Sequence, residues 1–119
     1  MSELKSLPSS LRDKERYIIF SIEADRAFDL GDVVDAVWKG LLDFLGEKEV
    51  AKANPWIMGD LFSRKKQVGG IRVTKDYVSD CRTAIALIDQ ISGKNVCLHV
   101  LGVSGTLKSA RDKYLQALD

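Results

Sequence analysis

The chain has few of the residues that build disulfide frameworks, zinc sites or nucleophilic active sites. Its 119 residues include two prolines, two cysteines and one histidine. Cys81 and Cys97 lie far apart, and neither has a second Cys or His at ligand spacing, so we expect two buried thiols and no metal site. One histidine supports no convincing Ser/His/Asp or Cys/His arrangement, so we expect no catalytic residue on this chain.

Long apolar runs and an excess of charge of one sign are also missing. The longest strongly apolar run near the N-terminus covers residues 17–20, too short for a signal peptide or a membrane span, so we expect a cytoplasmic protein without a membrane partner. The formal net charge is +1, which taken alone argues against a nucleic-acid partner. The length fits a single globular domain.

The apolar pattern predicts a polar N-terminal arm over residues 1–15 and one domain over residues 16–119. Alternation predicts a strand at 16–24, and helical spacing predicts a helix at 32–45, capped by Asp29 or Gly31 and stopped by Gly46. Two strands follow at 56–62 and 68–73, joined by Ser63-Arg64-Lys65-Lys66. Thr74 is the expected cap of a second helix ending at Gly93, before a strand at 96–101, a turn at 102–106 and a last helix.

This order, β-α-β-β-α-β followed by a helix, predicts an α+β fold of the ferredoxin-like (RRM-like) sandwich type with an antiparallel sheet. Two helices cover one sheet face, and the apolar outer face needs a cover, which we expect from the C-terminal helix. An RNA-recognition motif stacks bases on aromatic residues of its central strands, and the predicted third strand has none. Any RNA must then contact loops, arms and helix ends.

The location of charge is more informative than its sum. Residues 23–49 hold three basic and eight acidic residues, a net −5, whereas residues 50–119 hold eleven basic and six acidic residues, a net +5. A basic surface opposite an acidic first helix is therefore expected. The turn at 102–106 with Lys108 and Arg111 is a candidate phosphate site, although a plain Ser104 cap explains the same spacing. Glu23 and Asp25 are candidate magnesium ligands or, alternatively, a solvated strand end.

Several segments together resemble the archaeal ribonuclease P protein component 2 family, whose eukaryotic relatives are shared by nuclear ribonuclease P and MRP. The resemblance covers almost the whole chain in order and is most distinctive at the Leu-Gly-Val-Ser-Gly-Thr segment. The segments are residues 7–14 leading into 16–18, Ala53-Asn54-Pro55-Trp56, the helix over 77–88, and residues 100–108 with Arg111, Lys113 and Tyr114.

The resemblance implies a non-catalytic subunit of the ribonucleoprotein that removes the 5′ leader from precursor tRNA, with a ferredoxin-like fold carrying extra helices. It implies no cofactor on this chain, because the catalytic magnesium ions belong to the RNA subunit. The implied partners are the ribonuclease P RNA, a TIM-barrel-like protein subunit and other ribonuclease P proteins, with precursor tRNA as the substrate of the holoenzyme. A homodimer within a heterotetramer is one arrangement that the family allows.

Combining charge with the resemblance gives two sets of candidate residues. The predicted protein interface lies on the first helix, at Val34, Trp38 and Leu41. The predicted RNA contacts are Arg12, Lys14, Arg16, Arg64, Lys65, Lys66, Ser104, Gly105, Thr106, Lys108, Arg111 and Lys113. Two alternatives stay open: a stand-alone magnesium-dependent nuclease that uses Glu23 and Asp25, and a small-molecule-binding regulatory domain of the ACT type.

Overall fold

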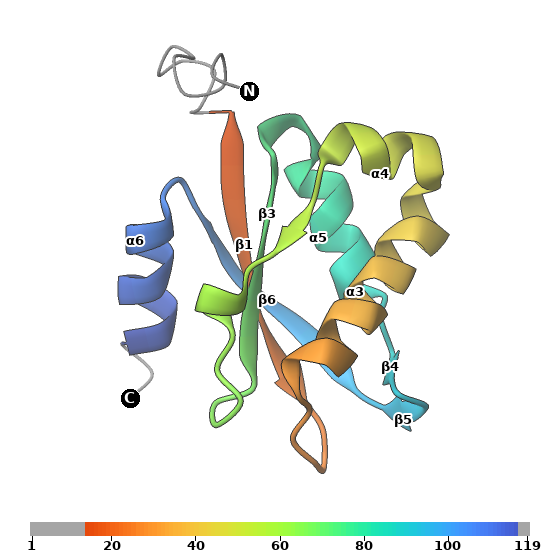
Figure 1. The fold of residues 1–119 in the computed structure, drawn as a ribbon, viewed down its shortest axis with the longest axis vertical. Helices are drawn as coiled ribbons and strands as arrows, with labels where there is room; N and C mark the ends of the chain where they lie inside the picture. The colour runs from red at the N-terminus through yellow and green to blue at the C-terminus, as the bar shows by residue number, and fades with distance from the viewer. Residues whose placement is uncertain (1–13, 117–119) are drawn as a thin grey trace.

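Four antiparallel strands form the central sheet of a computed structural model, which describes residues 14–116 and the side chains of residues 14–114. The strand order is β2 (Trp56–Ile57), β3 (Val68–Thr74), β1 (Glu15–Glu23) and β6 (Cys97–Ser104) (Figure 1). In β1, alternation sends Ile18, Phe20 and Ile22 to one face. The sheet confirms the predicted ferredoxin-like topology.

Helices α3 (Leu30–Leu45) and α5 (Val78–Ala86) pack together and cover this face of the sheet, which we call the inner face (Figure 1). The buried stripe of α3 is Val33, Val37 and Leu41, spaced four residues apart so that all three point at the sheet. They join the main hydrophobic core with the inner-face residues of β1, β3 and β6. This packing confirms the predicted two-helix layer.

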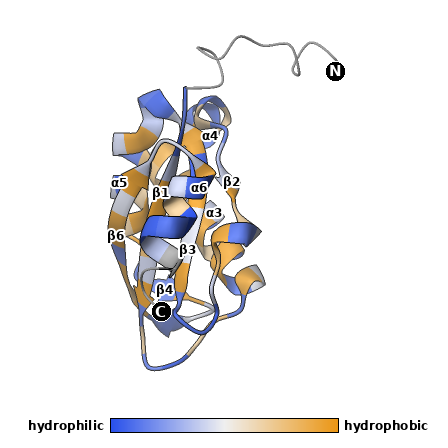
Figure 2. Ribbon diagram, turned by 90° about the vertical axis from the view of Figure 1, so that its left-hand side faces the viewer, coloured by the Kyte–Doolittle hydropathy of each residue, from blue (hydrophilic) through white to orange (hydrophobic). Residues whose placement is uncertain are grey.

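The opposite face, which we call the outer face, is partly covered by α6 (Leu107–Ala110) and its π-helical continuation η3 (Arg111–Gln116) (Figure 2). Leu107, Ala110 and Tyr114 pack there in a second hydrophobic cluster that includes Ile19 and Leu61. The expectation that the last helix covers the outer face is confirmed for this part of the sheet. Cys97, His99 and Leu101 of the same face stay exposed.

Several predicted boundaries are wrong. An additional helix, α4 (Glu47–Ala53), follows the predicted stop at Gly46, whose φ of 83° turns the chain between two helices. The expected strand at 56–62 is only the two residues of β2, followed by the 3₁₀ turn η1 (Gly59–Leu61).

The second predicted helix is shorter than expected and has a different start and end. It begins after the 3₁₀ turn η2 (Lys75–Tyr77), and Thr74 donates its hydroxyl to the Ala53 carbonyl rather than capping through its side chain. It ends before a hairpin of β4 (Gln90–Ile91) and β5 (Lys94–Asn95). Within the described part of the chain, no helix is long and apolar enough to cross a membrane.

Candidate functional site

The structure divides the predicted RNA contacts between the two ends of the sheet. Lys14 and Arg16 lie where β1 begins, and the backbone N–H of Lys75 donates to the Lys14 carbonyl over 2.5 Å. The loop with Arg64, Lys65 and Lys66 lies at the other end, where the Ile22 N–H donates to the Gln67 carbonyl. Arg16 and Ile22 are six residue steps apart along β1, roughly 20 Å. Arg12 lies outside the described residues, so the structure does not place it.

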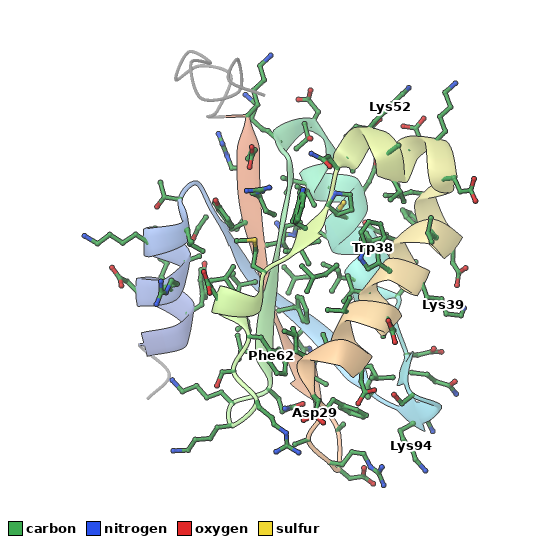
Figure 3. All side chains as sticks on the ribbon, in the orientation of Figure 1. Asp29, Trp38, Lys39, Lys52, Phe62 and Lys94 are labelled. Carbon is green, nitrogen blue, oxygen red and sulfur yellow. The ribbon has the colours of Figure 1, made fainter. Side chains whose placement is uncertain are left out.

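The basic loop before β3 is tied to the start of the first helix. The Arg64 guanidinium forms an ion pair with Asp29, with 2.6 Å between Nε and Oδ1, at the lower end of the view in Figure 3. The Gln67 side chain accepts from the Phe28 N–H and donates to the Phe28 and Arg64 carbonyls. Part of the positive charge of this loop is thus already matched, while Lys65 is exposed.

The turn before α6 differs from the predicted phosphate site. β6 continues through Ser104, whose side chain is buried, so the turn consists of Gly105 and Thr106. The cap is Thr106, whose Oγ1 accepts from the Ser109 N–H over 3.1 Å, and not Ser104. The predicted strand ended before Gly102, but β6 continues two residues beyond this glycine. Ser104 therefore lies within the strand with a buried side chain and is not available as an RNA contact.

The solvent side of α6 and η3 carries a short basic row. Lys108, Arg111 and Lys113 are all exposed, and Asp112 is the acidic residue among them. Shallow hollows on this surface are lined mainly by the same residues. We call Lys108, Arg111 and Lys113 the α6 basic row; it lies on the outer face, opposite the α3–α5 layer (Figures 1 and 2).

Sequence reasoning missed a polar-aromatic row across the outer face near the start of β1. Arg72 of β3 is paired in register with Trp56 on one side and Tyr17 on the other. Its guanidinium carbon lies 5.5 Å from the centroid of the Trp56 ring, and its Nε lies 2.8 Å from Oε2 of Glu15. Base-stacking aromatic residues were expected on the central strands, where the third strand has none and the first offers only Tyr17, whereas this exposed ring comes from the edge strand β2.

The predicted protein interface on α3 changes by one residue. Leu41 has no exposed surface because it belongs to the stripe that faces the sheet, so it is wrong as an interface residue. Leu42, which is 40% exposed, lies four residues after Trp38 and eight after Val34. Trp38 is 36% exposed and Val34 is half-buried. These three residues form an apolar stripe on the outside of the molecule.

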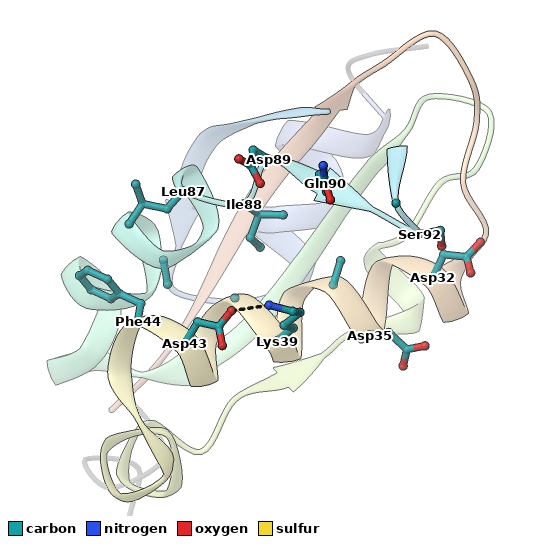
Figure 4. A pocket seen from close by; sticks show the side chains of 14 residues that line it. Asp32, Asp35, Lys39, Asp43, Phe44, Leu87, Ile88, Asp89, Gln90 and Ser92 are labelled. Carbon is teal, nitrogen blue, oxygen red and sulfur yellow. Dashed lines mark hydrogen bonds and ion pairs between the residues drawn. The ribbon is translucent and has the colours of Figure 1, made fainter. Parts of the chain in front are cut away.

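On the α5 side of α3, a groove of about 560 Å³ runs between this helix and the chain after α5 (Figure 4). Four aspartates and one lysine line it, with Phe44, Leu87 and Ile88 as apolar contacts; the charged residues are Asp32, Asp35, Asp43, Asp89 and Lys39. Lys39 is paired with Asp43 over 2.6 Å, and that hydrogen bond raises the lysine pKa. The groove is therefore acidic.

Three side chains of the kinds that bind metal ions lie close together where β1 and β6 are paired. Glu23 is paired in register with Cys97, and His99 Nε2 lies 2.7 Å from Glu23 Oε1. The ligand atoms of all three residues lie within 4.8 Å of one another, and all three residues are exposed. The expectation of a buried Cys97 without a neighbouring ligand is wrong, because Cys97 and His99 alternate onto the same strand face. Asp25 is outside this group.

The Cys81 thiol and the Tyr77 hydroxyl have raised pKa values, and both side chains pack in the main hydrophobic core. Burial raises the pKa of the Cys81 thiol to about 11, which confirms this cysteine as a buried thiol. The Tyr77 hydroxyl donates to Glu49, and this hydrogen bond raises the tyrosine pKa to about 12. Both groups stay protonated at neutral pH and stabilise the fold in that form.

Comparison with known families finds a match over most of the chain. The family model described as the Rpp14/Pop5 family matches residues 16–115. Three curated relatives named ribonuclease P protein component 2 align closely. The relative from Pyrococcus horikoshii is 39% identical over 97% of this chain and 94% of its own. The one from Thermococcus kodakarensis is 40% identical over 93% and 91%, and the one from Methanocaldococcus jannaschii is 38% identical over 94% and 81%.

A solved structure shares the fold. It is a chain of the cryo-EM structure of yeast ribonuclease MRP, with a TM-score of 0.59, 13% identity and coverage of 89% of both chains. At this identity the likeness concerns the fold alone.

Proposed function

Because the chain belongs to the Rpp14/Pop5 family and is a non-catalytic protein subunit of ribonuclease P, we propose that it contacts RNA with its outer face and partner proteins with its helix layer. RNA and other ribonuclease P components are its partners as a member of this family. The TIM-barrel-like subunit is the proposed protein partner, and precursor tRNA is the substrate of the proposed holoenzyme. The curated relatives are archaeal, so we place this work in the cytoplasm.

The observation that carries this proposal is the separation of charge by the sheet. The α6 basic row lies on the outer face, whereas the acidic groove and the apolar stripe of Val34, Trp38 and Leu42 lie on the helix layer. The α6 basic row attracts phosphates, and the acidic groove repels them. A protein that brings RNA and protein together needs two such surfaces.

α6 also determines how RNA contacts this fold. Leu107, Ala110 and Tyr114 cover the part of the sheet around Ile19, so bases have no access to that part of the outer face. RNA is therefore held mainly by side chains that neutralise phosphates. Such contacts lower the repulsion between converging RNA helices, and in this proposal the magnesium ions that do the chemistry stay with the RNA subunit.

The proposed RNA contacts at described positions are Lys14, Arg16, Arg64, Lys65, Lys66, Gly105, Thr106, Lys108, Arg111 and Lys113. The two ends of the sheet are too far apart for one phosphate to reach both. We therefore assign the start of β1 with the α6 basic row to one RNA segment, and the loop before β3 to a second, weaker contact, because Arg64 is already paired with Asp29. Arg12 remains a proposed contact on the N-terminal side of the first group.

The test is a double substitution in the α6 basic row. Lys108→Ala with Arg111→Ala is expected to weaken binding to the ribonuclease P RNA and to reduce the slope of log K against log salt by about 2, one for each phosphate contact. The matched control is Lys48→Ala with Lys94→Ala, which also removes two exposed positive charges. Lys48 belongs to α4 and Lys94 to the β4–β5 hairpin, so neither is part of the α6 basic row. Equal affinity and slope in the two double variants would contradict the assignment.

A further inference from the structure

Resting on the proposed function, we propose that Trp56 and Arg72 form a stacking site for one unpaired RNA nucleotide at the edge of the sheet. The Trp56 ring is 55% exposed on the two-residue edge strand β2. Large aromatic rings are normally buried to a greater extent, so an exposed Trp beside an Arg marks a contact surface. Indole rings and guanidinium planes are the groups on which proteins stack unpaired bases.

A charged group lies beside the Trp56 ring. Arg72 lies over the ring at 5.5 Å and is itself held by Glu15 at 2.8 Å. On the far side of Arg72 lies Tyr17, which is paired in register with it. Glu15 and the Trp56 ring both contact the Arg72 guanidinium, which holds the ring and the guanidinium together before a ligand binds and reduces the entropic cost of binding.

A small hollow adjoins this pair. It has a volume of about 150 Å³ and is lined by backbone and side-chain atoms of Lys14, Glu15, Asn54, Arg72, Val73 and Thr74. Asn54 enters it from a left-handed turn with φ of 49°, directly before Pro55. The Asn54 amide can offer a donor and an acceptor to the edge of a flat heterocycle, whereas the Thr74 hydroxyl already donates to the Ala53 carbonyl and Glu15 is paired with Arg72.

The surrounding charge favours RNA over protein. Lys14, Arg72 and Lys75 lie at this end of the sheet, and Glu15 is paired with Arg72, so positive charge remains for the phosphates on either side of the base. Trp38 gives the contrast, since its neighbours on the α3 surface are the apolar Val34 and Leu42. The two tryptophans of the chain thus serve two kinds of partner.

The site differs from the platform of an RNA-recognition motif. There, bases stack on the central strands, whereas α6 covers that region here. The proposed nucleotide lies beyond the reach of α6, at the free edge formed by β2. This placement explains why the exposed aromatic belongs to the edge strand.

The two tryptophans allow a direct test with the full chain. In a Trp38→Phe variant, Trp56 is the sole tryptophan, and a ten-nucleotide single-stranded RNA should quench its fluorescence, while a blunt RNA duplex should not. In the reciprocal Trp56→Phe variant, the same single strand should leave the Trp38 fluorescence unchanged. Equal quenching of both tryptophans, or of neither, overturns the site.

Affinity for the ribonuclease P RNA separates this site from the proposed function. Trp56→Ala should weaken binding roughly 5- to 150-fold, the range for loss of one stacking aromatic, and Trp56→Phe should restore most of it. Arg72→Lys keeps the charge but loses the planar group, so it should bind less tightly than the wild type. Circular dichroism of each variant shows whether the fold is retained.

Three results overturn or support the inference in different ways. If Lys108→Ala with Arg111→Ala weakens RNA binding while Trp56→Ala does not, the nucleotide site is wrong and the proposed function stands. If Trp56→Ala leaves RNA affinity unchanged but weakens assembly with the protein subunits, the ring belongs to a protein interface. Loss of affinity in Trp56→Ala with rescue by Trp56→Phe supports the stacking site.

Discussion

The contact between Gly102 and Tyr114 is the most sensitive point in the attachment of α6. A Cβ atom added at Gly102 would lie 2.0 Å from the Tyr114 hydroxyl oxygen and 2.7 Å from Cζ. Non-bonded heavy atoms need about 3.5 Å, so the ring must move by about 1.5 Å. Because Tyr114 packs in the outer cluster with Ile19, Leu61 and Ala110, such a shift pulls the side chain out of its contacts.

We therefore expect Gly102→Ala to lower the free energy of unfolding by about 1–3 kcal/mol, the usual cost of overpacking. In a Tyr114→Ala background the obstacle is absent, and the same substitution should be neutral or stabilise by about 0.5 kcal/mol, because alanine loses less entropy than glycine in a strand. The sign of the Gly102→Ala effect should thus depend on the residue at position 114.

The assay is guanidinium unfolding of the four proteins in this double-mutant cycle, followed by circular dichroism. The expected coupling is about 1–3 kcal/mol between the two positions, within the range for residues in contact. Limited proteolysis adds a local measure, because α6 and η3 are short and depend on docking, so cleavage in this segment should be faster in Gly102→Ala. An equal loss of stability in both backgrounds would refute the steric argument.

Further predictions concern the α3 surface and the two thiols. Leu41→Ala should cost about 2–5 kcal/mol in guanidinium unfolding, because it leaves a cavity in the core, whereas Leu42→Ala should change stability by about 0.5 kcal/mol or less and weaken assembly with the protein subunits in a pull-down. Burial raises the pKa of Cys81 from 9.0 to about 11, so its contribution to stability is complete below pH 9 and is lost as pH rises towards 11. The guanidinium midpoint should fall over this interval, and Cys81→Ala should flatten the fall. At neutral pH, iodoacetamide should label Cys97 in the folded protein and Cys81 only after unfolding, as mass spectrometry of the peptides would show.

The order of elements was predictable because each long element has a clear apolar period. The strand at the start of the domain alternates, the first helix repeats every three to four residues, and both were expected within one or two residues of their observed ends. What periodicity does not show is which of two adjacent stripes faces the sheet. Val33, Val37 and Leu41 have the same spacing as Val34, Trp38 and Leu42, and only the packing of α3 distinguishes them.

Local turns account for most of the errors. Ser92 and Gly93, with φ of 51° and 76°, form the tight turn of the β4–β5 hairpin, but a glycine at that place is also a common helix end. Because Ile88 and Ile91 are three residues apart, they fit a helix extended to Gly93 as well as the buried loop and strand observed. The same short-range ambiguity hid α4, since Gly46 with positive φ joins two helices as readily as it ends one.

The grouping of the proposed RNA-contact residues was harder to predict, because it depends on which end of the sheet each loop reaches. The sequence places Arg64 closer to Arg72 than to Asp29, yet Arg64 is paired with Asp29, and Arg72 is paired with Glu15 at the opposite end. The antiparallel register produces both pairings, because it reverses the direction of β3 relative to β1. Charge counts along the chain therefore locate basic segments but not surfaces.

The cover that α6 forms on the outer face helps to explain why a net charge of only +1 suits this chain. Since α6 occupies the part of the sheet where related folds stack bases, the proposed RNA binding relies on phosphate contacts and on the exposed edge near Trp56. Phosphate contacts need local positive charge, while the acidic groove beside α3 would repel RNA from the proposed protein-binding surface. A strongly basic chain would weaken that discrimination, so near-neutrality with opposite charges on opposite faces is the arrangement that suits a subunit lying between RNA and protein.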